Sequence, residues 1–168
     1  MAEAAKPVYL VDPEADPVVV RIEGRACFQN SPCLREFISE MLRRGRSRFL
    51  IDFSGCASMD STFLGVVAGV ALELRRASPP GHLVACRVGE RNLELMRSLG
   101  LHRLLEINAA DGTSAPCPQA LESRSTGSEA ENARHVLEAH ENLVSADEEN
   151  RRRFQDVLTF LRLRVERS

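Results

Sequence analysis

Asp60, Ser61 and Thr62 carry the best placed reactive groups of this chain, because a carboxylate and two hydroxyls stand together between two different sequence patterns. The preceding run, residues 48–53, is apolar and rich in strand formers, which predicts a buried strand. Over residues 63–74 apolar side chains recur at helical spacing, and two arginines follow, where cations complement a helix dipole. The three polar residues therefore lie at a helix N-terminus, where the negative charge of a phosphate is tolerated.

The same residues have a plainer interpretation, which the sequence leaves open. Ser and Asp are favoured helix N-caps, so Asp60 and Ser61 could do no more than accept hydrogen bonds from backbone N–H groups. Catalysis is not expected, because the chain has no Gly-x-Ser-x-Gly elbow and no glycine-rich phosphate loop. Asp60 is next to Ser61 in sequence, and such a carboxylate is not an oriented general base. We therefore expect a non-enzymatic protein.

The elements before this junction follow from turn and cap signals. Residues 8–11 and 18–22 are predicted to form a hairpin around a turn that contains two prolines. Ser31 is predicted to cap a helix whose first turn holds Pro32, and Gly45 is predicted to end that helix.

The elements after it alternate between strand and helix. Asp52 is expected to close the central strand, and residues 54–58 are small and turn-forming. Beyond the central helix, the pattern predicts a strand at 83–88, a helix at 90–99 and a strand at 104–107. This order indicates an α/β fold in which helices cover a mixed, mostly parallel sheet of five strands.

The last third of the chain differs in composition from the part before it. After a domain at residues 1–108, residues 109–127 are small, polar and proline-punctuated, which predicts a linker that need not pack. Residues 128–168 contain two amphipathic helical patterns, each preceded by a capping-box signal, at Ser128 and at Ser145. Such a pair does not hold its shape alone, so we expect it to cover the sheet, to pair with itself or to bind another chain.

Composition excludes several classes of partner. Tryptophan is absent, tyrosine occurs once and the net charge is −2, so neither base stacking nor a basic face for nucleic acid is expected. No apolar run is long enough for a membrane span and the N-terminus lacks a signal-peptide pattern, which favours a cytoplasmic protein. The five cysteines form no C-x-x-C pair and the four histidines are scattered, so we expect reduced thiols, no metal site and no cofactor.

The segment IDFSGCASMDSTFLGVVAGV resembles the core motif of the STAS domain, the fold of bacterial anti-sigma factor antagonists. With the order of elements above, the resemblance covers residues 8–108. It implies that a partner-switching serine kinase phosphorylates Ser61, that Asp60 positions the site and contributes to kinase recognition, and that Thr62 is at best a secondary site.

Two departures from the family pattern concern the choice of partner. Phe63 stands where the family usually has Gly or Ala, and Cys27 belongs to a loop in which an Asp is common after the position of Gly24. The predicted partner-binding residues are therefore Asp60, Ser61, Thr62, Phe63 and Cys27.

The resemblance leads to two functional hypotheses. The first is a bacterial phosphoprotein that regulates transcription as an anti-sigma factor antagonist. It binds an anti-sigma factor serine kinase and is switched off by phosphorylation of Ser61. A phosphatase is a possible further partner. The second is a STAS scaffold, a homo-oligomer subunit that uses the C-terminal helices as its interface.

Overall fold

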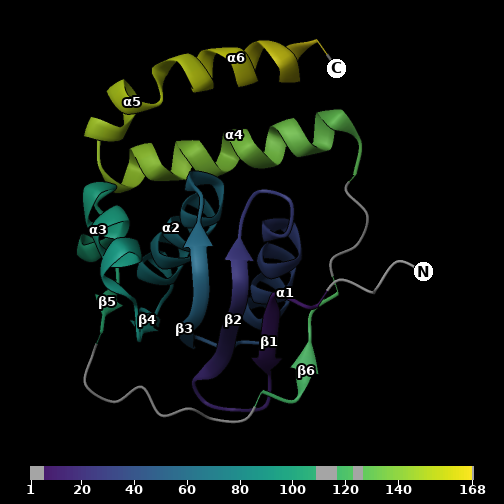
Figure 1. Ribbon diagram of the computed structural model, residues 1–168, viewed down its shortest axis with the longest axis vertical. Helices are drawn as coiled ribbons and strands as arrows, with labels where there is room; N and C mark the ends of the chain where they lie inside the picture. The colour runs from purple at the N-terminus through teal and green to yellow at the C-terminus, as the bar shows by residue number, and fades with distance from the viewer. Residues whose placement is uncertain (1–5, 109–116, 123–126, 168) are drawn as a thin grey trace.

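The computed structural model describes residues 6–108, 117–122 and 127–167. Within them, a sheet with the strand order β5-β4-β3-β2-β1-β6 forms the centre of the molecule (Figure 1). Its strands are β1 (Tyr9–Asp12), β2 (Val18–Ala26), β3 (Arg48–Met59), β4 (His82–Cys86), β5 (Glu106–Ile107) and β6 (Gln119–Ala120). The strands from β2 to β5 pair in parallel, whereas β1 is antiparallel to β2 and to β6. The expected α/β fold with a mixed, mostly parallel sheet is confirmed.

The sheet of the described residues has one strand more than the five expected. The extra strand, β6, comes from the segment predicted to be an unpacked linker, and its neighbour Leu121 donates its backbone N–H to Tyr9 O at 2.9 Å. An edge strand leaves backbone groups unpaired, so even a two-residue segment gains hydrogen bonds by pairing with β1. Most of the predicted linker, residues 109–116 and 123–126, lies outside the described residues.

The central strand is longer than its sequence pattern suggested. The turn expected at residues 54–58 is wrong, because β3 continues to Met59 and pairs with the extended second half of β2. Two register shifts in this pairing flank Gly24, whose φ of 108° favours glycine. Asp52 consequently does not close the strand but lies buried within it, 3.6 Å from Arg21 Nε.

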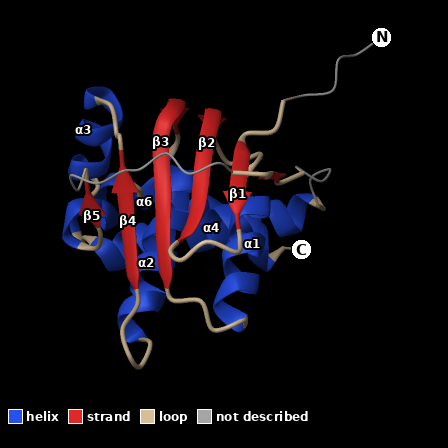
Figure 2. Ribbon diagram, turned by 90° about the horizontal axis from the view of Figure 1, so that it is seen from below, coloured by secondary structure: helices blue, strands red, loops and turns tan. Residues whose placement is uncertain are grey.

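Figure 2 shows the helices gathered on one side of the sheet. Those of the first 108 residues are α1 (Ser31–Arg43), α2 (Ser61–Arg76) and α3 (Glu90–Ser98), with a 3₁₀ turn at Leu101–Arg103. The helix α2 is the most deeply buried of them, since ten of its residues are buried. Of the strand predicted at residues 104–107, only Glu106–Ile107 forms β5, because the backbone N–H groups of Leu104 and Leu105 bond back to Leu101 O of the 3₁₀ turn.

The C-terminal tail, residues 127–167, forms two further layers outside α2. The helix α4 (Glu129–Ala146) lies against α2, and α6 (Gln155–Glu166) lies against α4 on its outer side, after the short α5 (Glu149–Arg153) (Figure 1). One of the three expected arrangements thus occurs, because the tail pairs with itself, and it also covers the domain. It covers helix α2, however, rather than the sheet.

One of the two predicted caps of the tail is confirmed. Ser128 caps α4 and accepts a hydrogen bond from Glu131 N at 3.2 Å. Ser145 is not a cap, because α4 continues through it to Ala146. The chain turns at Asp147 instead, whose Oδ1 accepts from Glu149 N at 3.0 Å. Of the helices in the described ranges, none combines the length and apolar character that crossing a membrane requires.

Candidate functional site at the start of α2

Asp60 holds the junction between β3 and α2 together. Its backbone is extended, with φ −111° and ψ 173°, and its Oδ1 accepts the N–H of Phe63 at 2.9 Å, as expected for a helix N-cap. Its other oxygen, Oδ2, accepts the N–H of Phe28 at 2.7 Å. One carboxylate therefore caps α2 and also ties the loop after β2 to the start of that helix.

Ser61 is the first residue of α2, and its hydroxyl contacts the tail. Ser61 Oγ lies 2.9 Å from Nε2 of His140, and Nδ1 of the same ring lies 2.7 Å from the carbonyl oxygen of Val136. Because a carbonyl oxygen can only accept, Nδ1 carries a proton, and in the neutral ring Nε2 is then the acceptor. The Ser61 hydroxyl therefore donates to His140, a residue 79 positions away in sequence.

This serine–histidine pair lacks the arrangement of a nucleophile with its base. In a catalytic triad a carboxylate orients the histidine and stabilises its charged form, whereas a backbone carbonyl performs the orienting here. The ring of His140 is 4% exposed and meets the ring of Phe154 edge-on at 4.9 Å. The pair is best described as a contact that seats α4, and the chemistry left to Ser61 is that of a hydroxyl at a helix N-terminus.

A second serine–histidine pair joins the tail to α1. Ser31 Oγ lies 2.7 Å from His135 Nε2, so Ser31 does not cap α1 as predicted; Asn30 occupies the N-cap position. Burial, with the nearby Arg35 guanidinium adding to it, lowers the pKa of His135. Two histidines of α4 that are five residues apart thus contact the first residues of α1 and α2.

Two glycines of α2 let α4 approach closely. A Cβ on Gly65 would lie 2.1 Å from the carbonyl oxygen of Ala139, and a Cβ on Gly69 would lie 2.4 Å from Asn142 Nδ2. The Asn142 amide also donates to Gly65 O at 3.2 Å. We call the area that α4 covers, marked by Ser31, Ser61, Gly65 and Gly69, the Ser61 surface.

The five residues predicted for partner binding are distributed over core and surface. Asp60 and Ser61 are partly exposed, whereas Thr62, Phe63 and Cys27 are buried. The Phe63 ring is fully buried, with ring centroids 6.4 Å from Tyr9 and 6.2 Å from Phe53. Phe63 therefore fills the core of the domain.

The residues that sequence reasoning missed are His135 and His140. A histidine within an amphipathic helix carries no local signal of what it contacts, so no pattern in the sequence pointed to them. Phe28, 50% exposed beside the buried Cys27, was also missed. Metal binding finds no support in the described ranges, where no group of His, Cys, Asp and Glu side chains is placed to hold an ion.

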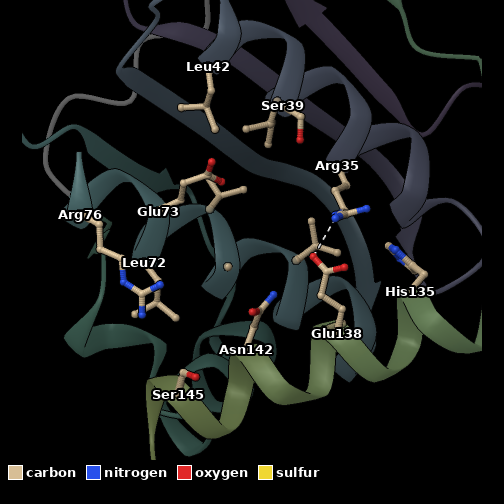
Figure 3. Close-up of a pocket in the computed structure, with 15 residues that line it drawn as sticks. Arg35, Ser39, Leu42, Leu72, Glu73, Arg76, His135, Glu138, Asn142 and Ser145 are labelled. Atoms are coloured by element: carbon tan, nitrogen blue, oxygen red, sulfur yellow. Dashed lines mark hydrogen bonds and ion pairs between the residues drawn. The ribbon is translucent and has the colours of Figure 1, made fainter. Parts of the chain in front are cut away.

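A cavity of about 490 Å³ lies between α1, α2 and α4, next to the Ser61 surface (Figure 3). Arg35 of α1 and Glu138 of α4 bridge its mouth with an N–O distance of 2.7 Å, and Asn142 and Glu73 extend toward it. The helix α4 therefore packs closely against Gly65 of α2, whereas a cavity separates it from part of α1.

The geometry defines a class of protein: an α/β domain that presents an Asp-Ser pair at the start of a central helix. A family model described as "Mlab, STAS domain" matches residues 10–106. The chain therefore belongs to the STAS domain family, and the expected family is confirmed.

Solved structures show the same fold. The unphosphorylated anti-sigma factor antagonist SpoIIAA is 20% identical, with a TM-score of 0.51, over 61% of this chain and 89% of that one. The phosphorylated form of the Bacillus cell fate determinant SpoIIAA is 19% identical, with a TM-score of 0.50, over 61% and 92%. A putative anti-sigma factor antagonist from Thermotoga maritima is 19% identical, with a TM-score of 0.50, over 62% and 86%. No curated protein sequence matches the chain.

Proposed function

We propose that this protein is an anti-sigma factor antagonist, which binds an anti-sigma factor serine kinase through the Ser61 surface and is released when that kinase phosphorylates Ser61. The observation that carries the proposal is the Ser61 hydroxyl at the start of α2, held in a STAS domain by the Asp60 cap. The matched structures support it, because they include an antagonist in its unphosphorylated form and a relative in its phosphorylated form.

The position of Ser61 suits a phosphate switch physically. A phosphoserine carries about −1.5 to −2 charges, and the dipole of α2 stabilises negative charge at its N-terminus. A partner that has to desolvate this surface meets that charge as repulsion. Phosphorylation would therefore change binding without unfolding the domain. Under this proposal the protein acts by binding rather than by catalysis, in the cytoplasm of a bacterium, and a phosphatase restores the binding form.

The test compares wild-type protein, Ser61→Ala and Ser61→Glu as baits in a lysate of the source cell, with bound proteins identified by mass spectrometry. Ser54→Glu is the matched control, because Ser54 is an exposed serine of β3 outside the Ser61 surface. We expect a kinase on wild type, on Ser61→Ala and on the control, and its loss from Ser61→Glu. Identical proteins on all four baits would contradict the switch.

A specific observation favours the second candidate function, an oligomeric STAS scaffold. Val157, Phe160 and Leu163 lie at spacings of three on α6 and are 41%, 60% and 48% exposed. Such an apolar stripe suits contact with a second copy of the chain. Light scattering of the full chain tests it: Phe160→Asp should reduce the mass, whereas Thr159→Asp, a charge on the neighbouring exposed residue, should not. A monomeric wild-type protein would exclude this function.

A further inference from the structure

The tail occupies the surface to which the proposed function assigns the partner. Its helix α4 contacts the N-terminal residues of α1 and α2 through the two serine–histidine pairs, and its backbone passes directly over Gly65. We propose that residues 127–167 are a displaceable internal ligand of the Ser61 surface, which has to leave before another protein binds there. That the displacing protein is a kinase rests on the proposed function; that the tail is displaceable does not.

The docked tail blocks the reaction of Ser61 as well as the binding of a partner. His140 Nε2 lies 2.9 Å from Ser61 Oγ, where an entering phosphoryl group would need to stand. Phosphoryl transfer requires the donor, the phosphorus and the attacking oxygen roughly in line at close range. A buried imidazole at hydrogen-bond distance leaves no room for that group. Phosphorylation of Ser61 therefore requires α4 to move away first.

The contacts of the tail are the kind that can be exchanged for water or for another protein. Interfaces between parts of one chain that move relative to each other are more polar than a domain core. The polar contacts between tail and domain include Ser31–His135, Ser61–His140, Arg35–Glu138, Asn142–Gly65, Asn150–Leu99, Arg153–Ser98 and Arg103–Asp147. Of the described tail residues, Leu143 belongs to the continuous buried core, and Ala146 and Phe154 pack against it partly buried. Release of the tail thus removes Leu143 from that core and Phe154 from its edge, and opens a cavity already lined by charged groups (Figure 3).

The domain is complete without the tail in the proteins that it matches. The family model ends at residue 106, before the tail begins. The match to the solved antagonist covers 61% of this chain and 89% of that one. The antagonist therefore folds without a counterpart to most of the rest of this chain. The sheet and α1 to α3 should therefore stay folded when the tail departs.

The first test uses a substitution in the full-length chain to release the tail, and then measures whether the Ser61 surface binds an added copy of the tail. Ala139 is 1% exposed against Gly65, so Ala139→Glu should release α4, while Ala130→Glu, in the partly exposed first turn of α4, is the matched control. The probe is a fluorescent synthetic peptide of residues 127–167. We expect saturable binding to Ala139→Glu, at least tenfold weaker binding to wild type and to Ala130→Glu, and none for a peptide that itself carries Ala139→Glu. The tail attached in cis competes at an effective concentration that is typically millimolar.

Each other result overturns the proposal. If hydrogen exchange shows α4 of Ala139→Glu as protected as in wild type, a charge buried against Gly65 does not release the tail, and the tail is not a displaceable ligand. If Ala139→Glu loses protection throughout the sheet, the tail is an integral part of the domain. If the sheet stays protected and the peptide does not bind, the Ser61 surface does not bind the tail as a ligand.

A second test locks the tail in place. A Cβ on Gly69 would lie 3.0 Å from Asn142 Cγ, and a disulfide places each Cβ about 3 Å from the partner sulfur. Gly69→Cys with Asn142→Cys should therefore form a disulfide, and the tail has no cysteine of its own. Combined with Ala139→Glu, the oxidised form should lose peptide binding and the reduced form should regain it. Equal peptide binding by both forms would contradict displacement.

The disulfide between Gly69→Cys and Asn142→Cys, which we call the lock, also allows the displacement of the tail and the proposed function to be tested independently. With the kinase from the bait experiment, the oxidised lock in an otherwise wild-type chain should not be phosphorylated at Ser61, and the reduced form should be. If no kinase is found, the antagonist function fails while the peptide result stands. If the oxidised lock is phosphorylated as fast as the reduced form, the function stands and the gating by the tail fails.

Discussion

Gly65→Ala should separate the stability of the tail from that of the domain. The new Cβ would lie 2.1 Å from the Ala139 carbonyl oxygen and 2.7 Å from the Ala139 Cβ. Ordinary contacts of a Cβ begin near 3.4 Å, so α4 has to move by roughly 1 Å, since backbone atoms cannot rotate away as a side chain can. The same substitution at Gly69 meets only the amide end of Asn142, which can turn aside.

Two free-energy changes of opposite sign decide how Gly65→Ala affects the domain and the docking of the tail. Alanine is favoured over glycine in a helix interior by about 1 kcal/mol, and α2 gains this whether or not the tail is docked. The clash and the two hydrogen bonds affect only the docked state of the tail. Overpacking destabilises that state by about 1–3 kcal/mol. Weakening of the Ser61–His140 and Asn142–Gly65 hydrogen bonds destabilises it by about 0.5–1.5 kcal/mol each. We therefore expect docking to weaken by about 2–6 kcal/mol while the domain becomes slightly more stable.

Hydrogen exchange followed by mass spectrometry resolves the two effects. Amides of α4 in Gly65→Ala should exchange roughly 30-fold to 20,000-fold faster than in wild type, since about 1.4 kcal/mol corresponds to a factor of ten. Amides of β2 and β3 should exchange no faster. In Gly69→Ala, the matched control, α4 should change by no more than about tenfold, the value of one hydrogen bond. Equal effects at the two glycines, or faster exchange throughout the sheet of Gly65→Ala, would refute the reasoning.

Three further predictions concern the contacts around this surface. Because the pKa of His135 is lowered in the docked state, by burial and by Arg35, tail docking should be complete above pH about 6.5 and weaken as the pH falls below it. Exchange of α4 amides against pH measures this, and His135→Gln should flatten the profile. Asp60→Ala should lower the free energy of unfolding by about 1–2 kcal/mol in urea titrations, whereas Asp60→Asn, which can still cap α2, should lose only a few tenths; equal losses would contradict the cap. Asn150 is fully buried and donates to two backbone carbonyls, so Asn150→Ala should lower the melting temperature by the equivalent of about 1–3 kcal/mol, and an unchanged melting temperature would count against that network.

The sequence predicted the junction around Ser61 well because its signals are local. The change from a strand pattern to a helical pattern placed the start of α2 at Asp60 and Ser61, and the cap hydrogen bond to Phe63 N spans only three residues. The cap at Ser128 was predicted correctly for the same reason. In each case the partners of the interaction lie within one helical turn, so their spacing alone is informative.

The same signals failed where pairing between distant segments decided the structure. Residues 54–58 are small and look like a turn, yet parallel pairing with the second half of β2 makes them part of β3. Ser145 has the neighbours of a cap but lies inside α4, where packing against the domain continues the helix. Phe63 looked like a bulky neighbour of a partner site, and only the positions of Tyr9 and Phe53 place its ring in the core.

By itself, the sequence determined that this is an α/β chain of the STAS type, with a hydroxyl at the start of its central helix and two amphipathic helices at its end. Only the tertiary structure decided that those helices close over that hydroxyl and bring His140 to Ser61. The physical reason is that periodicity reveals which face of a helix is apolar, while the surface that covers the face is set by shape. Here that shape is the close approach at Gly65, which two segments separated by more than 70 residues create together.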